Sequence, residues 1–243
     1  MYDQLQSMAH QLRLFGIHGS VERRCQEALA EALHPGELVR LILEDESDAR
    51  RRAAAKRLTK RAKFRREAEL EGWDWTRDRG LSKAKFKELA LLNFYHRALS
   101  LIIDGPTGVG KTELALALGH RLCAQGISVQ FYSVNLFFEE IMAARVGGTY
   151  LKFVEKLRKV SVIIFDDFGL RSYTHDEASA LQDILEERYG KGINIITSQV
   201  SPAGWLSLFE DRVIGESIVD RLSNPTEIIT LKGESVRPGR SIN

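Results

Sequence analysis

A glycine-rich octapeptide at residues 105–112, GPTGVGKT, constrains the fold of this chain more than any other stretch. It fills every fixed position of the pattern G-x-x-x-x-G-K-[ST], which binds nucleotide phosphates. The apolar residues 101–103 precede it as a short strand would, and residues 113–125 have helical composition and end at Gly126. Strand, loop and helix in this order are the context that the motif requires. The octapeptide therefore predicts a nucleotide site in an α/β domain.

The residue types of this loop explain how it would bind a nucleotide. Glycines allow successive backbone N–H groups to turn toward the phosphates, and the following helix directs its positive end at them. Lys111 is expected to reach the β- and γ-phosphates, and the Thr112 hydroxyl is expected to bind Mg²⁺. We expect ATP to contact the complete loop, formed by Gly105, Pro106, Thr107, Gly108, Val109, Gly110, Lys111 and Thr112.

The composition narrows the class of protein. With 243 residues, of which 44% are hydrophobic, the chain can form one large domain or an α/β domain with a smaller attachment. No apolar run approaches the roughly 18 residues of a membrane span, and no signal-peptide core is present, so we expect a cytoplasmic protein without a membrane partner. Cys25 and Cys123 are expected to be separate thiols, and the histidines lack the spacing of a zinc site.

Positive charge is concentrated in residues 50–66, although the formal net charge of the chain is only +2. This stretch contains ten Lys and Arg residues and no Asp or Glu. A solvated helix surface is the other interpretation, but exposed helices usually alternate charges to form i,i+4 pairs. We expect contacts with the phosphates of double-stranded DNA, independent of base sequence and weakened by salt. The side chains expected to make them are Arg50, Arg57, Lys60, Arg61 and Arg65.

The first 98 residues show no strand pattern. Helices are predicted at residues 2–14, 21–33 and 83–99, with one or two more within residues 37–66, and Pro35 and Gly36 are expected to close the second. Trp73 and Trp75, in a predicted linker, are expected to pack against the neighbouring domain rather than to stack on bases. The predicted organisation is a helical domain for DNA or partner binding at 1–71, a linker and lead-in helix at 72–98, and the ATPase core at 99–243.

Strand and helix patterns alternate after residue 99. Strands are predicted at residues 101–104, 129–133, 160–165, 193–197 and 228–231. Helices are predicted at residues 112–124, 136–144, 149–158, 177–189 and 216–222. Such alternation is typical of a parallel sheet covered on both faces, so the fold class is α/β with a five-stranded parallel sheet.

An apolar strand at residues 162–165 ends in Asp166 and Asp167, about 50 residues after the phosphate loop. Ligands of such folds bind at the carboxyl ends of the strands. Because a buried strand does not itself need an acid at its end, these carboxylates are expected to serve a ligand. We expect Asp166 to hold Mg²⁺ through water, together with Thr112. Asp167 is expected to orient and polarise the attacking water as a general base.

Polar residues also follow the predicted strand 193–197. In ATPases of the additional-strand class this strand lies between the loop strand and the aspartate strand, so Thr197 or Ser198 would sense the γ-phosphate. A shift of one residue reverses the faces of a strand, so counting does not choose between them, and a simple turn is the alternative.

Further on, Arg221 fits an arginine finger acting on a neighbouring subunit, or a helix arginine paired with an acid, and Arg212 competes for the finger role.

The segments GPTGVGKT, VIIFDDFG, NIITSQ, SPAGWLSLF, IVDRL and LKGES, in this order, resemble the IstB family. Its members are ATPase subunits encoded beside the transposase in one class of insertion sequences, and are relatives of the DnaC helicase loader among AAA+ ATPases. The resemblance spans essentially the whole chain. It implies an AAA+ core that binds ATP between subunits of a homo-oligomer, assembles on DNA, hydrolyses ATP slowly and helps the transposase engage target DNA. It also makes Arg221 the preferred finger.

The chain departs from the AAA+ pattern in two places. Most AAA+ proteins have Glu where Asp167 stands, and the shorter side chain predicts modest turnover. The chain ends soon after Leu231, so the lid is expected to be reduced or absent, with Arg237 as the candidate second sensor. Two other functions remain open, a helicase loader of the DnaC type and a nucleotide-locked DNA-binding assembly module with negligible hydrolysis. The expected catalytic residues are Lys111, Asp166, Asp167, Thr197, Ser198 and Arg221.

Overall fold

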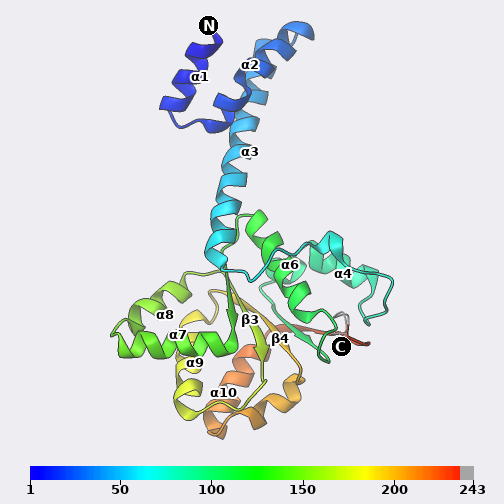
Figure 1. Cartoon of the computed structure of the whole chain (residues 1–243), viewed down its shortest axis with the longest axis vertical. Helices are drawn as coiled ribbons and strands as arrows, with labels where there is room; N and C mark the ends of the chain where they lie inside the picture. The colour runs from blue at the N-terminus through cyan, green and yellow to red at the C-terminus, as the bar shows by residue number, and fades with distance from the viewer. Residues whose placement is uncertain (236–243) are drawn as a thin grey trace, which may run out of the picture. The chain divides into compact units, whose positions relative to one another are not determined.

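The computed structural model describes residues 1–235 (Figure 1). The helices of the first part are α1 (Tyr2–Gln11), α2 (Phe15–Ala30), α3 (Pro35–Ala62), η1 (Leu70–Gly72), α4 (Lys83–Ala90) and α5 (Asn93–His96). The elements that follow are β1 (Ser100–Asp104), α6 (Lys111–Ala124), β2 (Val129–Ser133), α7 (Val134–Val146), α8 (Tyr150–Arg158), β3 (Val162–Phe168), α9 (His175–Arg188), β4 (Ile193–Ser198), η2 (Pro202–Leu208), α10 (Arg212–Ser223) and β5 (Thr226–Thr230).

The chain forms two compact units. The first comprises residues 1–57 with 124–126, and the second comprises residues 58–123 with those from 127 onward. The boundary falls inside α3, earlier than the predicted boundary after residue 71. Residues between these two positions join the core of the second unit, where Ala62, Ala68 and Leu70 are buried. The functional division into a binding domain and an ATPase core stays a prediction.

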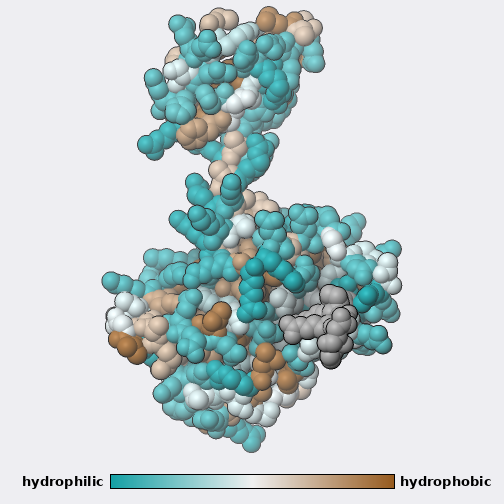
Figure 2. All heavy atoms as spheres, in the orientation of Figure 1, coloured by the Kyte–Doolittle hydropathy of each residue, from teal (hydrophilic) through white to brown (hydrophobic). Residues whose placement is uncertain are grey.

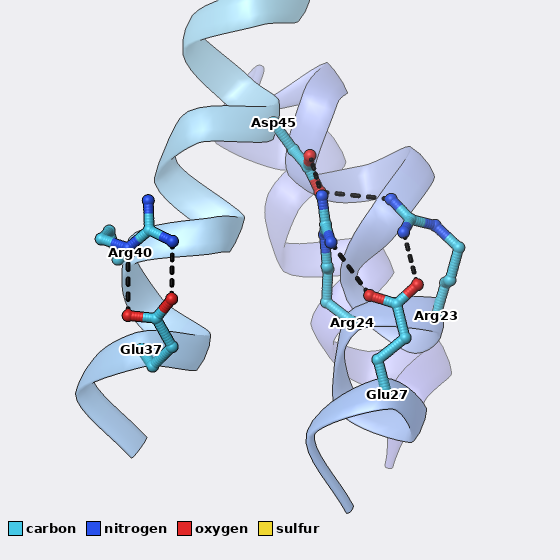
Figure 3. Close-up of polar contacts among 6 residues, drawn as sticks. All are labelled: Arg23, Arg24, Glu27, Glu37, Arg40 and Asp45. Atoms are coloured by element: carbon cyan, nitrogen blue, oxygen red, sulfur yellow. Dashed lines mark hydrogen bonds and ion pairs between the residues drawn. The ribbon is translucent and has the colours of Figure 1, made fainter. Parts of the chain in front are cut away.

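The first unit contains α1, α2 and most of α3. Arg13 adopts a left-handed backbone conformation with φ 57°, which ends α1 before the predicted limit at residue 14. Pro35 does not close the second helix as predicted but is the first residue of α3, where its fixed φ suits a helix start. Figure 3 shows the guanidinium of Arg24 in α2 forked against the carboxylate of Asp45 in α3, with both nitrogen–oxygen distances 2.8 Å.

Two further left-handed residues, both in the second unit, interrupt predicted helices. Lys63, with φ 57°, follows the end of α3 at Ala62, so the helical stretch predicted within residues 37–66 ends early. Leu92, with φ 58°, separates α4 from α5 within the predicted helix 83–99. Leu92 and Phe94 are buried in the core, and this packing offsets the unfavourable backbone conformation.

The five strands form one parallel sheet in the order β2-β3-β4-β1-β5. This confirms the predicted fold class, and β4 lies between the loop strand β1 and the aspartate strand β3. Strand residues alternate between two cores, since Leu101 and Ile103 pack with α6 whereas Ile102 packs with α7, α9 and α10. Figure 1 shows helices on both sides of this sheet. Trp73 is buried in the first of these cores, as predicted, whereas Trp75 is 43% exposed and does not join it.

Two further features concern the surface and the end of the chain. Most of the face seen in Figure 2 is hydrophilic, and no helix within residues 1–235 is long and apolar enough to cross a membrane. No further helix occurs between β5 and Ser235, the last described residue. Arg237, the candidate second sensor, lies outside the described residues.

Candidate nucleotide site

The phosphate loop connects β1 to the first turn of α6. Gly105, Gly108 and Gly110 have φ values of 139°, 85° and 100°, a region that residues with a side chain rarely adopt. A Cβ at Gly105 would also lie 2.1 Å from the carbonyl oxygen of Leu231. The loop therefore requires glycine for its shape, and it precedes the N-terminus of α6, where the helix dipole favours anions.

Lys111 lies inside the loop rather than in solvent. Its side chain is buried, and its Nζ donates to the carbonyl oxygens of Gly105 at 2.8 Å and Pro106 at 2.7 Å. These contacts hold the ammonium group beside the concave side of the loop. The position suits a cation that contacts the phosphates of a nucleotide held there.

Asp166 is the buried centre of the site. Its Oδ1 accepts hydrogen bonds from the hydroxyls of Thr112 at 2.8 Å and Thr197 at 2.6 Å. Its Oδ2 is buried and has no hydrogen-bond partner among the described residues. Burial raises the pKa of Asp166, although both hydroxyls and the charge of Arg65 oppose the shift. A buried carboxylate oxygen without a hydrogen-bond partner calls for an explanation, and a bound cation is one.

The donor set at Asp166 fits Mg²⁺. This ion prefers oxygen ligands, keeps several waters and takes only one or two protein groups beside substrate phosphates. The Thr112 hydroxyl and the Asp166 carboxylate provide that set at the end of the phosphate loop. Within residues 1–235 no group of three or more His, Cys, Asp or Glu residues is placed to hold a metal ion. A metal here would therefore depend on the nucleotide for further ligands.

A bulge in β3 brings both aspartates to the same side. Neighbouring strand residues normally face opposite ways, but the register between β3 and β4 shifts between Phe165 and Phe168. Asp167 adopts φ 62° within this shift, and both aspartates line the same cavity. The general-base role of Asp167 stays a prediction, for which this arrangement provides the required access.

Thr197 and Ser198 have different surroundings, which the sequence alone did not reveal. The Thr197 hydroxyl donates to Asp166 and accepts from the backbone N–H of Asp167 at 3.0 Å. The Ser198 hydroxyl lies 2.8 Å from the carbonyl oxygens of Phe168 and Val200, so it hydrogen-bonds to the backbone next to β4. Thr197 is therefore the residue that the structure brings to the aspartates.

A cavity of about 520 Å³ opens over the loop, a size typical of small-molecule sites. Its opposite wall comes from the segment after α3, which includes Arg65, Trp73 and Arg79. The Arg79 guanidinium, 8% exposed, lies 4.2 Å from the centroid of the Trp73 ring and faces Gly110. Sequence reasoning missed Arg79 because it lies in a predicted linker and matches no motif.

Arg221 lies near the amino-terminal ends of the strands, whereas the phosphate loop lies at their carboxyl-terminal ends. Arg221 donates to the hydroxyl of Ser217 at 2.6 Å and forms an ion pair with Glu186. It lines a second cavity together with Ser100 and Ile193, the first residues of β1 and β4, whereas the phosphate loop follows the last residue of β1. The structure therefore does not bring Arg221 to the loop of its own chain. Arg212, 79% exposed, forms an ion pair with Glu216.

The residues expected to bind DNA do not share one environment. Arg50 pairs with Glu46 at 2.7 Å. Arg57, Lys60 and Arg61 are exposed on α3 and form no ion pair within the described part of the chain. Arg65 instead lines the nucleotide cavity, with one guanidinium nitrogen 3.9 Å from Oδ2 of Asp166. The turn at Lys63 separates it from the helical face on which it was predicted.

Comparison with known proteins identifies the family. The model of IstB-like ATP binding proteins matches residues 7–242. An insertion-sequence ATP-binding protein of Sinorhizobium fredii is 36% identical over 86% of this chain and 85% of that protein. An ATP-binding protein in an insertion sequence of Mycobacterium tuberculosis is 32% identical over 96% of this chain and 94% of that protein. The structure of the DnaC helicase loader shares the fold, with a TM-score of 0.58 and 21% identity over 68% of this chain and 97% of that chain. The family model and these two relatives show that this chain belongs to the family of IstB-like ATP binding proteins.

Proposed function

We propose that this chain hydrolyses ATP to ADP and phosphate and, as a homo-oligomer on double-stranded DNA, assists the transposase of its insertion sequence in engaging target DNA. The observation that carries the ATPase part is the buried Asp166, which receives the hydroxyls of Thr112 and Thr197 beside the phosphate loop. The names of the relatives, which place them in insertion sequences, support the transposition part.

The site residues have distinct roles in this reaction. Bound Mg²⁺ would neutralise charge on the β- and γ-phosphates, held by Thr112 and, through water, by Asp166. Lys111 exchanges the loop carbonyls for phosphate oxygens when ATP enters. Asp167 accepts a proton from the water whose oxygen attacks the γ-phosphorus, and the bond to the β-phosphate oxygen breaks, releasing ADP. Thr197 links both aspartates, so loss of the γ-phosphate can be transmitted into β4.

An interface between subunits would complete the site. Arg221 lies near the amino-terminal ends of the strands, opposite the phosphate loop, which supports its action on the nucleotide of a neighbouring chain. An arginine supplied in this way stabilises charge in the transition state of phosphoryl transfer. ATP would then join subunits on DNA, and its hydrolysis would release them. The short side chain of Asp167 predicts slow turnover.

Phosphate release by the full chain, with and without duplex DNA, tests the ATPase part. We expect Lys111→Ala to abolish nucleotide binding and ATP-dependent assembly on DNA, because it removes the cation inside the loop. Asp167→Asn should retain ATP binding within a few-fold and lower turnover by about 100-fold, the usual contribution of a general base. Wild-type protein that binds ATP but releases no phosphate with DNA present would leave the nucleotide-locked module as the function.

The partner protein separates the two DNA-related functions. The chain, loaded with a non-hydrolysable ATP analogue, is used to capture either the transposase of its insertion sequence or a replicative helicase. Capture of the transposase alone supports the proposed function. Capture of the helicase alone would instead identify a loader of the DnaC type. The Lys111→Ala variant serves as the control, because retention of a partner by this variant is independent of ATP.

A further inference from the structure

Arg65 reaches the nucleotide cavity through a defined local turn. The left-handed Lys63 directs the chain out of α3, and the ring of Phe64 then packs 4.3 Å from the ring of His120 in α6. The guanidinium of Arg65 lies 5.6 Å from the centroid of the Phe131 ring, within the range of a cation–π contact. These contacts fix the segment after α3 against α6 and β2 of the second unit, so packing determines the position of Arg65.

The charged end of Arg65 lies beside Oδ2 of Asp166, a buried oxygen that has no hydrogen-bond partner among the described residues; Asp166 and Asp167 are called the aspartate cluster below. The distance from its guanidinium to Oδ2 of Asp166 is 3.9 Å, too long for a hydrogen bond, and about half of the Arg65 side chain is exposed. Lys111 and Thr112 line the same cavity. Arg65 is thus near Asp166 without being held there by a direct hydrogen bond.

Arg66, the next residue, provides a contrast. It lines the same cavity, but its guanidinium forms an ion pair with Glu113 in the first turn of α6, and its carbonyl oxygen contacts the ring of His120 at 3.2 Å. Arg66 therefore has a carboxylate partner that is not part of the aspartate cluster. Arg65 and Arg66 therefore differ in their partners. Arg66 is paired with Glu113, whereas Arg65 has, among the described carboxylates, only the longer contact with Asp166.

We propose that Arg65 binds the terminal phosphate of ATP in its own chain, an inference that rests on the proposed ATPase function. Thr112 and Asp166 would hold Mg²⁺, which would supply positive charge to the terminal phosphates, so the guanidinium next to Asp166 lies where the γ-phosphate is expected. A cation bound at Asp166 would offset the charge of this carboxylate, which would leave the Arg65 guanidinium available to a phosphate oxygen. Guanidinium groups suit this task because they donate two parallel hydrogen bonds to phosphate oxygens.

Equilibrium binding of fluorescent ATPγS and ADP, both with Mg²⁺, tests the inference on the full chain. We expect Arg65→Gln to weaken ATPγS binding by about tenfold and ADP binding by no more than about twofold, because only ATPγS carries the third phosphate. Arg65→Lys should recover part of the loss. Arg66→Gln, the matched control in the same cavity, should leave the ratio of the two affinities at the wild-type value. Thermal melting without nucleotide checks that each variant is folded.

Three results would overturn the inference. Equal weakening of both nucleotides by Arg65→Gln would assign the residue to general packing of the cavity. An unchanged ratio, accompanied by loss of affinity for duplex DNA, would return Arg65 to the set of DNA-binding residues. Wild-type protein that binds neither nucleotide would overturn the proposed function as well, so this failure differs from that of the inference alone.

Discussion

At the scale of single residues, the Thr197 hydroxyl has a special position in the site. It uses its hydrogen to donate to Asp166 and a lone pair to accept from the N–H of Asp167. The same group therefore supports the buried carboxylate and the strained backbone of the bulge in β3. Its neighbour Ser198 is equally buried but contacts only backbone groups and the indole N–H of Trp205.

Replacing Thr197 by Val keeps the shape of the side chain and removes both hydrogen bonds. We expect ATP affinity within a few-fold of wild type, turnover lowered about tenfold or more, and a loss of stability of roughly 1–3 kcal/mol from the unsatisfied groups. Single-turnover phosphate release and urea unfolding measure the two effects. Ser198→Ala is the control, with lower stability and nearly normal turnover per folded molecule. A larger loss of turnover in Ser198→Ala would reverse the assignment of the sensor.

At the scale of elements, the pairing of α2 with α3 depends on a close approach and on charge. A Cβ at Gly16 would lie 2.5 Å from the carbonyl oxygen of Asp45, so glycine is required there. The backbone N–H of Gly16 donates to the buried Glu46 at 2.7 Å. Next to this contact, the hydrogen bond from Arg24 lowers the pKa of Asp45 to about 2.

The low pKa of Asp45 predicts how the first unit responds to acid. A carboxyl whose pKa is lower in the folded state stabilises the fold above its unfolded pKa of about 4, and this contribution disappears as the pH falls to about 2. Asp45→Asn should therefore lower the midpoint of urea unfolding of the first unit at pH 6 and have almost no effect on it at pH 2. Asp48→Asn, which removes an exposed pair with Arg51, should change neither value. Equal effects of the two variants at pH 6 would contradict this explanation.

The predictable elements are those whose determinants are local. The loop glycines, the apolar strand before Asp166 and the polar end of β4 lie within short segments, and the parallel sheet follows from their alternation with helices. The left-handed Lys63 and Leu92 were not predictable, because tertiary packing imposes a conformation that their residue types rarely adopt. Arg79 was missed for a related reason, since only folding of the distant segment brings it to Gly110.

At the scale of the whole molecule, charge is divided between paired and unpaired cations. On α3, Arg40 pairs with Glu37 and Glu44, whereas Arg57 and Arg61 form no ion pair with any described residue. Phosphate groups of DNA would bind the unpaired cations without first displacing a carboxylate. This difference makes Arg57 and Arg61, together with the equally unpaired Lys60, the stronger members of the proposed DNA-binding set.

Replacing Arg57 and Arg61 together by Gln should weaken binding to duplex DNA for every base sequence. The slope of log Kd against log salt should fall by close to 2, since each lost phosphate contact removes about 0.9. The control is Arg23→Gln with Arg40→Gln, which removes the same charge from cations already paired with acids. Fluorescence anisotropy at several salt concentrations gives both slopes. A slope that falls equally in the control would mean that only the net charge matters.

Arg221 lies near the amino-terminal ends of the strands and the phosphate loop at their carboxyl-terminal ends, which has a consequence for assembly. Under the proposed function each subunit has one side that donates Arg221 and one side that presents the nucleotide site. Subunits would therefore add head to tail, as in a heterologous contact. An open assembly then has one nucleotide site without a finger at one end and one unused finger at the other. Activity per subunit would rise with the length of such an assembly, and closure into a ring would complete every site at once.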